Sequence, residues 1–304
     1  MKPNISFCLY RPYFTKERVG LSTSVSHQIT DPSTIHGSSG EFYLNGSVAN
    51  VYLNFPIYSF DKMHIGVALE RNKISIHKNT PLKYCNFINQ YGEITKNFII
   101  NAGFSIDTRN NLLIPTKGFY QQVMADISML DLKYYKISAN FQYYLTFLKN
   151  YTFAINAIAD YGASYSKKDF PIIKNIYLGG IGTIRGFEGS SIGPKDAKTG
   201  NYLGGSRRIV TNIQFYIPTL NFPDSNKFRL FLFSDAGCIY SQNDSCNLSS
   251  FEKNHNFYDW RFSAGIGFSW KSPIGPMQFS YGYPLNKRND DKIQNFQFQI
   301  GTGF

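Results

Sequence analysis

Residue-by-residue alternation of apolar and polar side chains is the feature that most constrains the fold of this chain. In the segment 135–147 (YKISANFQYYLTF), seven apolar or aromatic residues occupy every odd position, and mostly polar residues such as Lys136 and Gln142 lie between them. The next segment, 151–162 (YTFAINAIADYG), continues the pattern. A period of two residues is typical of β-strands whose two faces meet different surroundings.

Thirteen segments of the chain carry this alternation or lie between turn signals as strands do. Many are ten residues or longer, above the usual five or six. Short turns and longer polar loops join them in alternation, and no helical pattern of any length separates them, so we predict an all-β, up-and-down antiparallel sheet. The predicted strands are 4–11, 18–28, 42–56, 62–76, 97–107, 118–129, 133–148, 151–165, 207–217, 228–240, 260–271, 276–285 and 295–304.

The composition of the two strand faces indicates what they contact. One face is rich in Gly, Ser, Asn and Gln, which suits a water-filled lumen, whereas the other carries Phe, Tyr and Trp, as at Trp270 and Tyr281. No stretch approaches the ~18 apolar residues of a membrane-spanning helix. We therefore predict a transmembrane β-barrel. A soluble β-sandwich is the alternative, and the strand lengths and the final segment 297–304 (QFQIGTGF) argue against it.

Charge and short motifs favour no enzymatic or nucleic-acid function. The net charge is +11, but the basic residues form no stripe that would favour nucleic acid. The segment GGIG misses a dinucleotide-binding spacing, and GSSIG, which would make Ser191 a nucleophile, lacks the flanking strand and helix that such a serine needs. The five histidines show no metal-ligand spacing. We expect no enzymatic activity, cofactor or metal. Cys238 and Cys246 flank a polar loop and could pair in an oxidising compartment.

The connection 166–206 is the candidate working loop, because a forty-residue connection in a compact domain is usually functional. Its segment 177–194 (YLGGIGTIRGFEGSSIGP) contains six glycines and one arginine, Arg185, between apolar neighbours. The flanking Ile184 and Phe187 suggest that this part of the loop packs against something. Asp235, in the predicted strand 228–240, faces the same side as Gly237 and could meet the arginine in the lumen, since a guanidinium binds a carboxylate through two hydrogen bonds.

At these residues the chain resembles the family of outer-membrane protein assembly factors called BamA. Ile184, Arg185, Gly186 and Phe187 match the family's (I/V)-R-G-F loop motif. The resemblance extends through three further segments: 105–119 (SIDTRNNLLIPTKGF), 232–240 (LFSDAGCIY) and 263–286 (SAGIGFSWKSPIGPMQFSYGYPLN). It also includes a last strand that ends in an aromatic residue. The matching segments occur in the family's order and cover essentially the whole chain.

The resemblance implies a sixteen-stranded outer-membrane barrel whose sixth extracellular loop, here 166–206, folds into the lumen. The motif arginine would dock on two acidic wall positions. Asp235 matches one of them, and Gln214 stands at the other, where the family usually has a glutamate. The segment at 4–14 resembles the family's fourth strand. We therefore expect about thirteen of the sixteen strands over residues 1–304, without POTRA domains, as a fragment of a longer polypeptide or the product of a decayed gene.

The function implied by the resemblance is assembly of β-barrel proteins in the bacterial outer membrane. A weak lateral seam would open at the last strand, whose edge would pair with an incoming strand by β-augmentation. The residues expected at this seam and in its C-terminal signal are Phe296, Phe298, Ile300, Gly301, Gly303 and Phe304. Expected partners are unfolded outer-membrane proteins, accessory assembly lipoproteins and outer-membrane lipid, with no nucleic acid. The alternative function is a polypeptide-secretion or passive transport pore.

Overall fold

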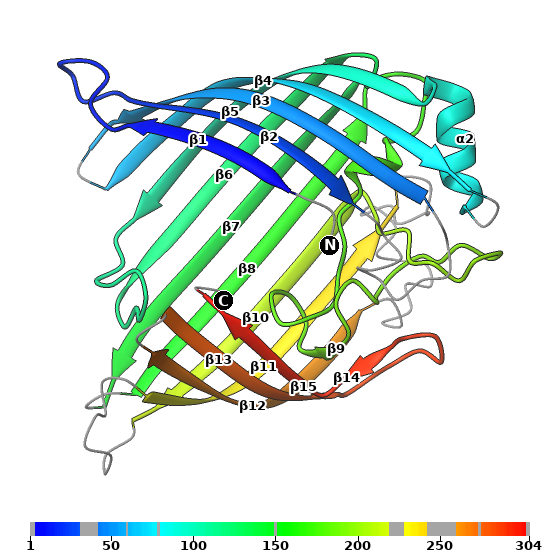
Figure 1. Ribbon diagram of the computed structural model, residues 1–304. Helices are drawn as coiled ribbons and strands as arrows, with labels where there is room; N and C mark the ends of the chain where they lie inside the picture. Colours follow the sequence, from blue (N-terminus) through cyan, green and yellow to red (C-terminus); the bar gives the residue numbers. More distant parts are fainter. Residues whose placement is uncertain are drawn as a thin grey trace, which may run out of the picture.

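The computed structural model describes residues 4–30, 42–58, 60–77, 80–148, 151–218, 228–241, 260–272 and 275–301. These residues form one curved sheet of thirteen antiparallel strands, each paired with its neighbours in chain order (Figure 1). The single continuous sheet confirms the predicted up-and-down antiparallel architecture and is inconsistent with a sandwich of two stacked sheets. The strands are β1 (Ile5–Arg11), β2 (Gly20–Thr30), β3 (Phe42–Pro56), β4 (Asp61–Ile76), β5 (Ile94–Asp107), β6 (Gly118–Leu130), β7 (Tyr134–Phe147), β8 (Tyr151–Ser164), β10 (Arg207–Ile217), β11 (Phe228–Tyr240), β12 (Arg261–Ser272), β13 (Gly275–Pro284) and β15 (Phe296–Ile300).

The convex outer face of the sheet is apolar, and the concave inner face is largely polar. On β4, Val67 and Leu69 are exposed on the outside, whereas Glu70 and Asn72 are buried on the inside. Adjacent side chains of a strand point to opposite faces. The alternation in the sequence therefore becomes a lipid-compatible exterior and a hydrophilic lumen, as is typical of membrane barrels.

The two edge strands of the sheet, β1 and β15, are not paired with each other among the described residues. Within the described ranges, β1 pairs with β2 alone, and β15 pairs with β13 alone. In Figure 1 the two strands lie on opposite sides of the opening between the sheet's ends. Each therefore presents one row of backbone N–H and C=O groups without a strand partner among the described residues.

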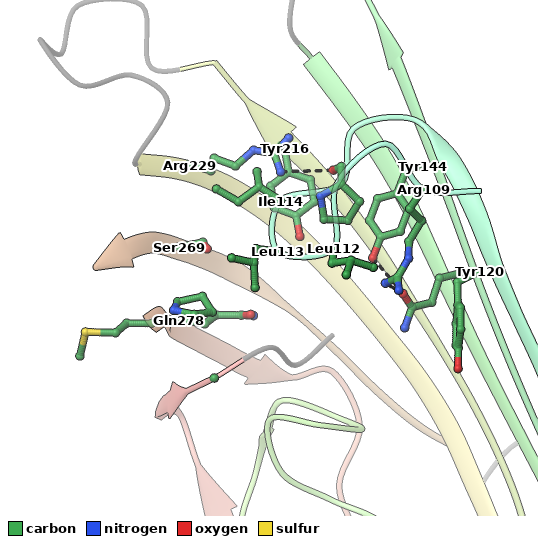
Figure 2. A pocket seen from close by; sticks show the side chains of 15 residues that line it. Arg109, Leu112, Leu113, Ile114, Tyr120, Tyr144, Tyr216, Arg229, Ser269 and Gln278 are labelled. Atoms are coloured by element: carbon green, nitrogen blue, oxygen red, sulfur yellow. Dashed lines mark hydrogen bonds between the residues drawn. The ribbon is translucent and has the colours of Figure 1, made fainter. Parts of the chain in front are cut away.

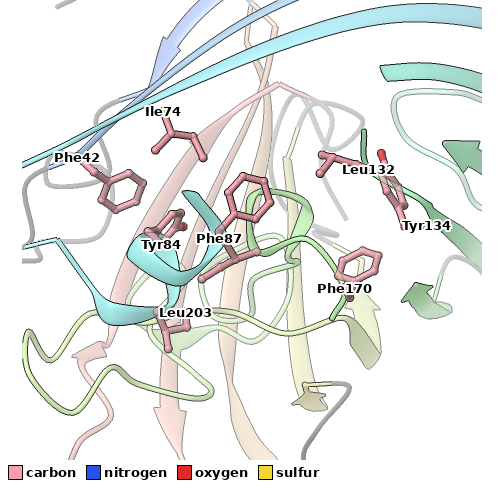
Figure 3. Close-up of a cluster of buried hydrophobic side chains, with 9 residues drawn as sticks. Phe42, Ile74, Tyr84, Phe87, Leu132, Tyr134, Phe170 and Leu203 are labelled. Atoms are coloured by element: carbon pink, nitrogen blue, oxygen red, sulfur yellow. The ribbon is translucent and has the colours of Figure 1, made fainter. Parts of the chain in front are cut away.

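In the part of the chain that the structure describes, one short α-helix interrupts the strands, contrary to the prediction that no helical pattern does. Helix α2 (Leu82–Tyr91) follows Pro81 and ends at Gly92, whose φ is +83°. It is held by packing, because Tyr84 and Phe87 lie in an apolar cluster with wall and loop residues (Figure 3). The members of this cluster are Phe42, Ile74, Tyr84, Phe87, Leu132, Tyr134, Phe170, Ile172 and Leu203. None of the described helices is long and apolar enough to cross a membrane.

The strand boundaries differ from the prediction mainly near the chain's end. β15 covers only Phe296–Ile300, whereas we predicted 295–304. Gly301 adopts φ +111°, a conformation that favours glycine, and residues 302–304 lie outside the described residues. Just before β15, the two-residue strand β14 (Ile293–Gln294) leaves the main sheet and pairs elsewhere.

Candidate functional site

The candidate site is the connection between β8 and β10, which we call the arginine loop (residues 165–206). It contains the short 3-10 helix η1 (Ile172–Lys174), the two-residue strand β9 (Gly186–Phe187) and isolated bridges such as Leu178 with Ile192. In Figure 1 the loop lies within the curve of the sheet.

Arg185 forms a buried two-pronged ion pair with Asp235 of β11. Its Nε donates to Asp235 Oδ2 at 2.8 Å, and its Nη2 donates to Oδ1 at 2.6 Å. The backbone N–H of Arg185 donates to the same Oδ2 at 2.9 Å. The side chains are 1% and 0% exposed. Parallel N–H···O bonds between planar partners fix orientation as well as distance, so this contact sets both the position and the direction of the loop.

Further inward-facing residues complete the surroundings of the ion pair. Asn212 of β10 donates through Nδ2 to Asp235 Oδ1 at 2.9 Å and to the backbone oxygen of Thr183 at 2.6 Å. Gln214, with its amide oriented to satisfy its neighbours, accepts from Arg185 Nη1 at 2.9 Å and Nη2 at 3.1 Å. The centre of the Phe233 ring lies 3.7 Å from the Arg185 guanidinium carbon. Each guanidinium nitrogen therefore donates to an acceptor, and one flat side of the group packs against an aromatic ring.

Apolar neighbours of Arg185 pack against the wall beside the ion pair. Ile184 and Phe187 are both fully buried, in a cluster with Leu178, Ile192, Val210 and Ile239. A Cβ at Gly237 of β11 would lie only 3.0 Å from Ile184 Cδ1. The inner wall therefore carries a glycine at the point where Ile184 of the loop packs against β11.

Gly186 and Gly282 bring two backbones into direct contact. Gly186 adopts φ +88°. A Cβ at Gly282 of β13 would lie 2.7 Å from the Gly186 backbone nitrogen, which is shorter than real Cβ contacts. Glycine at both positions therefore lets the motif backbone lie against the wall, a close approach that any side chain would prevent.

The motif also joins the segment that leads into the last strand. β9 pairs antiparallel with β14, matching Phe187 with Ile293 and Gly186 with Gln294. The amide nitrogen of Gln297, on β15, donates to the Phe187 backbone oxygen at 2.6 Å. Through these contacts the arginine loop is bonded to the terminal hairpin as well as to β10 and β11.

Several contacts anchor the remainder of the arginine loop. Arg208 of β10 forms an ion pair with Asp160 at 2.7 Å and donates to the Tyr177 backbone oxygen at 2.9 Å. At the loop's outer end, the Tyr202 hydroxyl donates to the Asp290 backbone oxygen at 2.6 Å. Burial raises the pKa of Tyr202 to about 12, with Asp291 adding to the effect, so this hydroxyl keeps its proton and its donor role at neutral pH.

The other residues singled out in the sequence are dispersed or not described. Phe296, Phe298 and Ile300 lie together on the outer face of β15, exposed by 60%, 45% and 57%. Gly303, Phe304, Cys246 and His255 lie outside the described residues, and Cys238 is buried in β11. The Ser191 hydroxyl donates to the Glu188 backbone oxygen at 2.7 Å, a loop-stabilising bond. Among the described residues, no group of three potential metal ligands comes together.

Sequence reasoning missed one glycine, two side-chain amides and one aromatic ring that complete the site. Gly282, Asn212, Gln297 and Phe233 all contact the motif or its partner, but none lies near it in the chain. The available signal was the odd or even position of each residue in its strand, because that position places all four on the inner face. Odd or even position gives the face of the sheet, and only the curvature of the whole sheet shows which inward residues contact one another.

Comparison with known proteins gives consistent matches over the whole chain. The Omp85 superfamily domain matches residues 2–304. The outer membrane protein assembly factor BamA of Neisseria meningitidis serogroup B is 28% identical over 99% of this chain and 41% of its own length. The crystal structure of Haemophilus ducreyi BamA lacking POTRA domains 1–3 aligns with a TM-score of 0.85 at 25% identity, over 97% of this chain and 61% of that chain. CdiB from Acinetobacter baumannii aligns with a TM-score of 0.59 at 13% identity, over 98% of this chain and 50% of its own, which shows a shared fold alone.

Proposed function

The chain belongs to the Omp85 superfamily, and from this premise we propose that its barrel takes part in the assembly and insertion of β-barrel proteins in a bacterial outer membrane. The names and similarity of its BamA relatives support this proposal. The chain spans 41% of the Neisseria relative, so the activity proposed is that of the barrel region within such a protein. The observation that carries the proposal is the weakly paired, open-edged last strand.

β15 is held to the sheet by far fewer pairs than most other strands. Among the described residues it pairs with β13 over five residues, from Tyr281 with Phe296 to Met277 with Ile300, whereas β12 and β13 share ten pairs. An edge strand with few pairs opens at low cost, because strand pairing is the principal interaction that holds it. The last strand is therefore the natural site of lateral opening.

The free edge of β15 has a defined set of donors. The Gly301 N–H donates to the Pro276 backbone oxygen, and the Gly282 N–H donates to the Asn295 backbone oxygen. The pairs Gly301–Pro276 and Asn295–Gly282, one at each end of β15, are therefore hydrogen-bonded pairs of the ladder with β13. Bonded and non-bonded pairs alternate in an antiparallel ladder. The backbone N–H groups of Phe296, Phe298 and Ile300 consequently point away from β13, toward the open side. An incoming extended segment would meet these donors first.

The proposed mechanism is templating of an incoming strand on this edge. An unfolded outer-membrane protein pairs with β15 by β-augmentation, which satisfies backbone groups that lipid cannot solvate. The docked arginine loop braces the neighbouring wall through Asp235 and the terminal hairpin through β14, so that opening is confined to the edge. No covalent bond is made or broken.

The test is a backbone substitution at the edge. Phe298→Pro removes one outward-pointing N–H while leaving the bonds to β13 in place, since proline is tolerated on the free side of an edge strand. We expect it to slow insertion of an unfolded β-barrel protein into liposomes by about tenfold, measured by heat-modifiable mobility of the inserted protein. Phe298→Ala, which keeps the N–H, is the matched control and should retain most of the activity.

The contrasting substitution Gln299→Pro separates template loss from loss of folding. Gln299 faces Gln278 in a bonded pair, so its proline variant should weaken the barrel itself. Normal insertion activity in the Phe298→Pro variant would contradict templating at β15. Equal loss in the Phe298→Pro and Phe298→Ala variants would assign the effect to the side chain and also contradict it.

The alternative of a transport pore remains a second proposal with weaker support. A pore needs an open lumen, whereas Ile184, Arg185 and Phe187 are buried between the arginine loop and the wall. The shared fold with CdiB at 13% identity carries no functional argument. Large, stable single-channel openings in planar bilayers would favour the pore, and their absence would favour assembly.

A further inference from the structure

The outer face of the sheet changes from apolar to basic near the end of the barrel that carries α2. Outward residues on neighbouring strands pair in rows across β2 to β6. One such row is entirely apolar: Val25, Ala49, Leu69, Phe98 and Met129. The next outward row toward α2 is polar and includes two cations: His27, Ser47, Arg71 and Lys96. The step from one row to the next is therefore a boundary between a hydrocarbon-compatible surface and a basic one.

Arg71 on β4 and Lys96 on β5 occupy directly opposed positions, and both side chains are exposed. Lys73, the next outward residue of β4, adds a third positive charge. None of these three side chains forms an ion pair within 4.0 Å with a carboxylate of the described residues. Asp131, next to the row, accepts a hydrogen bond from the Lys96 backbone N–H. Like charges directly opposite each other destabilise a sheet, so this pair favours a bound anion.

Two arginines inside the barrel show the contrasting, partnered arrangement. They line a cavity of about 490 Å³ on the inner side of the wall (Figure 2). Arg109 donates through Nε and Nη2 to Asp107 at 2.8 and 2.7 Å. Arg229 donates to the Pro115 backbone oxygen at 3.4 Å and lies 4.5 Å from the centre of the Tyr216 ring. The cations on the outer face have no comparable contacts among the described residues, so their partner has to come from outside the chain.

An apolar groove of about 380 Å³ lies beside the opposed cations on the outer face. Val25, Ala49, Leu69 and Leu130 line it, together with Arg71 and Lys96. A second groove on the outer face, of about 350 Å³, lies over β10 to β15 and has no charged side chain in its described lining. Two grooves of similar size therefore differ in one property, because only the first joins an apolar surface to a pair of cations.

The position of this boundary along the barrel indicates the leaflet that it faces. The connections at the α2 end, such as 31–41, 77–93 and 165–206, are long, whereas those at the opposite end include the short turns 57–60 and 148–150. Outer-membrane barrels carry their longer loops on the extracellular side. The basic row therefore lies toward the outer leaflet, with the apolar groove on its membrane side.

We propose that Arg71, Lys96 and the adjoining groove form a binding site for one phosphate-bearing lipid. The phosphate lies between the guanidinium and the ammonium group, because the planar fork of an arginine matches phosphate oxygens and both cations are attracted to the same anion. One acyl chain lies in the groove along Ala49 and Leu69. This inference goes beyond the proposed function and does not depend on it, since the site is on β4 and β5 rather than on β15.

The experiment is native mass spectrometry of the full chain in an uncharged detergent. It compares dioleoyl phosphatidic acid with dioleoylglycerol, which has the same acyl chains and no phosphate. We expect the phosphate lipid to bind roughly tenfold more tightly, since charge-assisted hydrogen bonds are the stronger ones. In the double variant Arg71→Gln, Lys96→Gln this preference should disappear. Arg207→Gln is the matched control, because Arg207 lies over the Tyr161 ring at 4.6 Å, outside the groove.

A second pair of variants tests the groove without changing any charge. Ala49→Phe fills the groove beside the cations and should weaken binding of phosphatidic acid several-fold. Ile266→Phe places the same side chain in the uncharged groove and should leave that binding unchanged. Equal affinity of the parent and the Ala49→Phe variant would overturn the proposal, because the acyl chain would then lie elsewhere.

Heat stability supplies a readout with opposite signs in the presence and absence of lipid. Without lipid, Arg71→Gln should be at least as stable as the parent, because it removes a repulsion. Phosphatidic acid should raise the melting temperature of the parent and not that of the double variant, since a ligand stabilises the state that binds it. A double variant stabilised as much as the parent would overturn the proposal.

The comparison of the two lipids on the unaltered protein needs no variant, so it holds even if a variant fails to fold. Equal binding of both lipids overturns the proposal. An equal loss of preference in Arg207→Gln also overturns it, because net charge alone would then attract the lipid. Displacement of phosphatidic acid by an equal concentration of inorganic phosphate would show an anion site that needs no lipid, and is likewise contrary to the proposal.

Discussion

Replacing Arg185 with alanine tests whether the arginine loop is clamped in the lumen by charge. The substitution removes two side-chain hydrogen bonds to Asp235 and leaves that carboxylate buried. Removing one partner of a buried ion pair costs about 3–5 kcal/mol. Asp235 keeps the Arg185 backbone N–H and Asn212 as donors, so we expect the lower end of this range, about 3 kcal/mol.

The assay is the temperature at which the folded, fast-migrating form is lost on a gel. A loss of about 3 kcal/mol should lower this temperature by roughly 5–10 °C, while the variant still reaches the membrane. The control is Lys292→Ala, which breaks an exposed 4.0 Å ion pair with Glu188 and should change little.

A double variant identifies the origin of the loss. Arg185→Met combined with Asp235→Leu removes both charges and should recover much of the stability, because apolar replacements of a buried pair are often neutral. An Arg185→Ala variant as heat-stable as the parent would refute the clamp. A double variant no more stable than Arg185→Ala would refute the argument that the cost comes from the stranded carboxylate.

Two further predictions concern packing of the loop and helix. Gly282→Ala places a Cβ 2.7 Å from the Gly186 nitrogen, so it should displace the motif and speed protease cleavage of the arginine loop. The control is Gly189→Ala, which has open space around its Cβ and should not change the cleavage rate. Equal cleavage in both variants would contradict the close approach. Phe87→Ala should destabilise the cluster around α2 by about 3 kcal/mol, seen as a lower melting temperature. Leu82 is exposed, so Leu82→Ala should have little effect. Equal effects of both substitutions would show that α2 does not pack as described.

The strands could be predicted from the sequence because their signal is local. Each inward or outward position follows from its parity alone, which placed Asp235 and Gln214 on the inner face together. Arg185 of the loop motif was the third member, and its contact with Asp235 was inferred from the inward position of Asp235 and then from the resemblance. At the last predicted strand, 295–304, the described part of β15 ends at Ile300 before Gly301, whose positive φ the sequence does not reveal, and residues 302–304 lie outside the described residues.

Helix α2 and the pairing of β9 with β14 were missed for different physical reasons. The spacing of Tyr84, Phe87, Ile88 and Tyr91, between Pro81 and Gly92, is a helical signal, but it is short and set among long alternating segments. The two-residue pairing of Phe187 with Ile293 has no periodic signal at all. It depends on the loop's docking, and therefore on contacts across the lumen.

The most direct measurement of the central claim is site-specific photo-crosslinking during assembly of an unfolded β-barrel protein. A photoreactive residue replaces Phe298 on β15 or, as the control, Ile213 on β10, which is also exposed on the outer face but lies between two paired strands. The account predicts crosslinks to the incoming protein from position 298 and few from position 213. Equal crosslinking from both positions, or none from position 298, would contradict templating at the last strand.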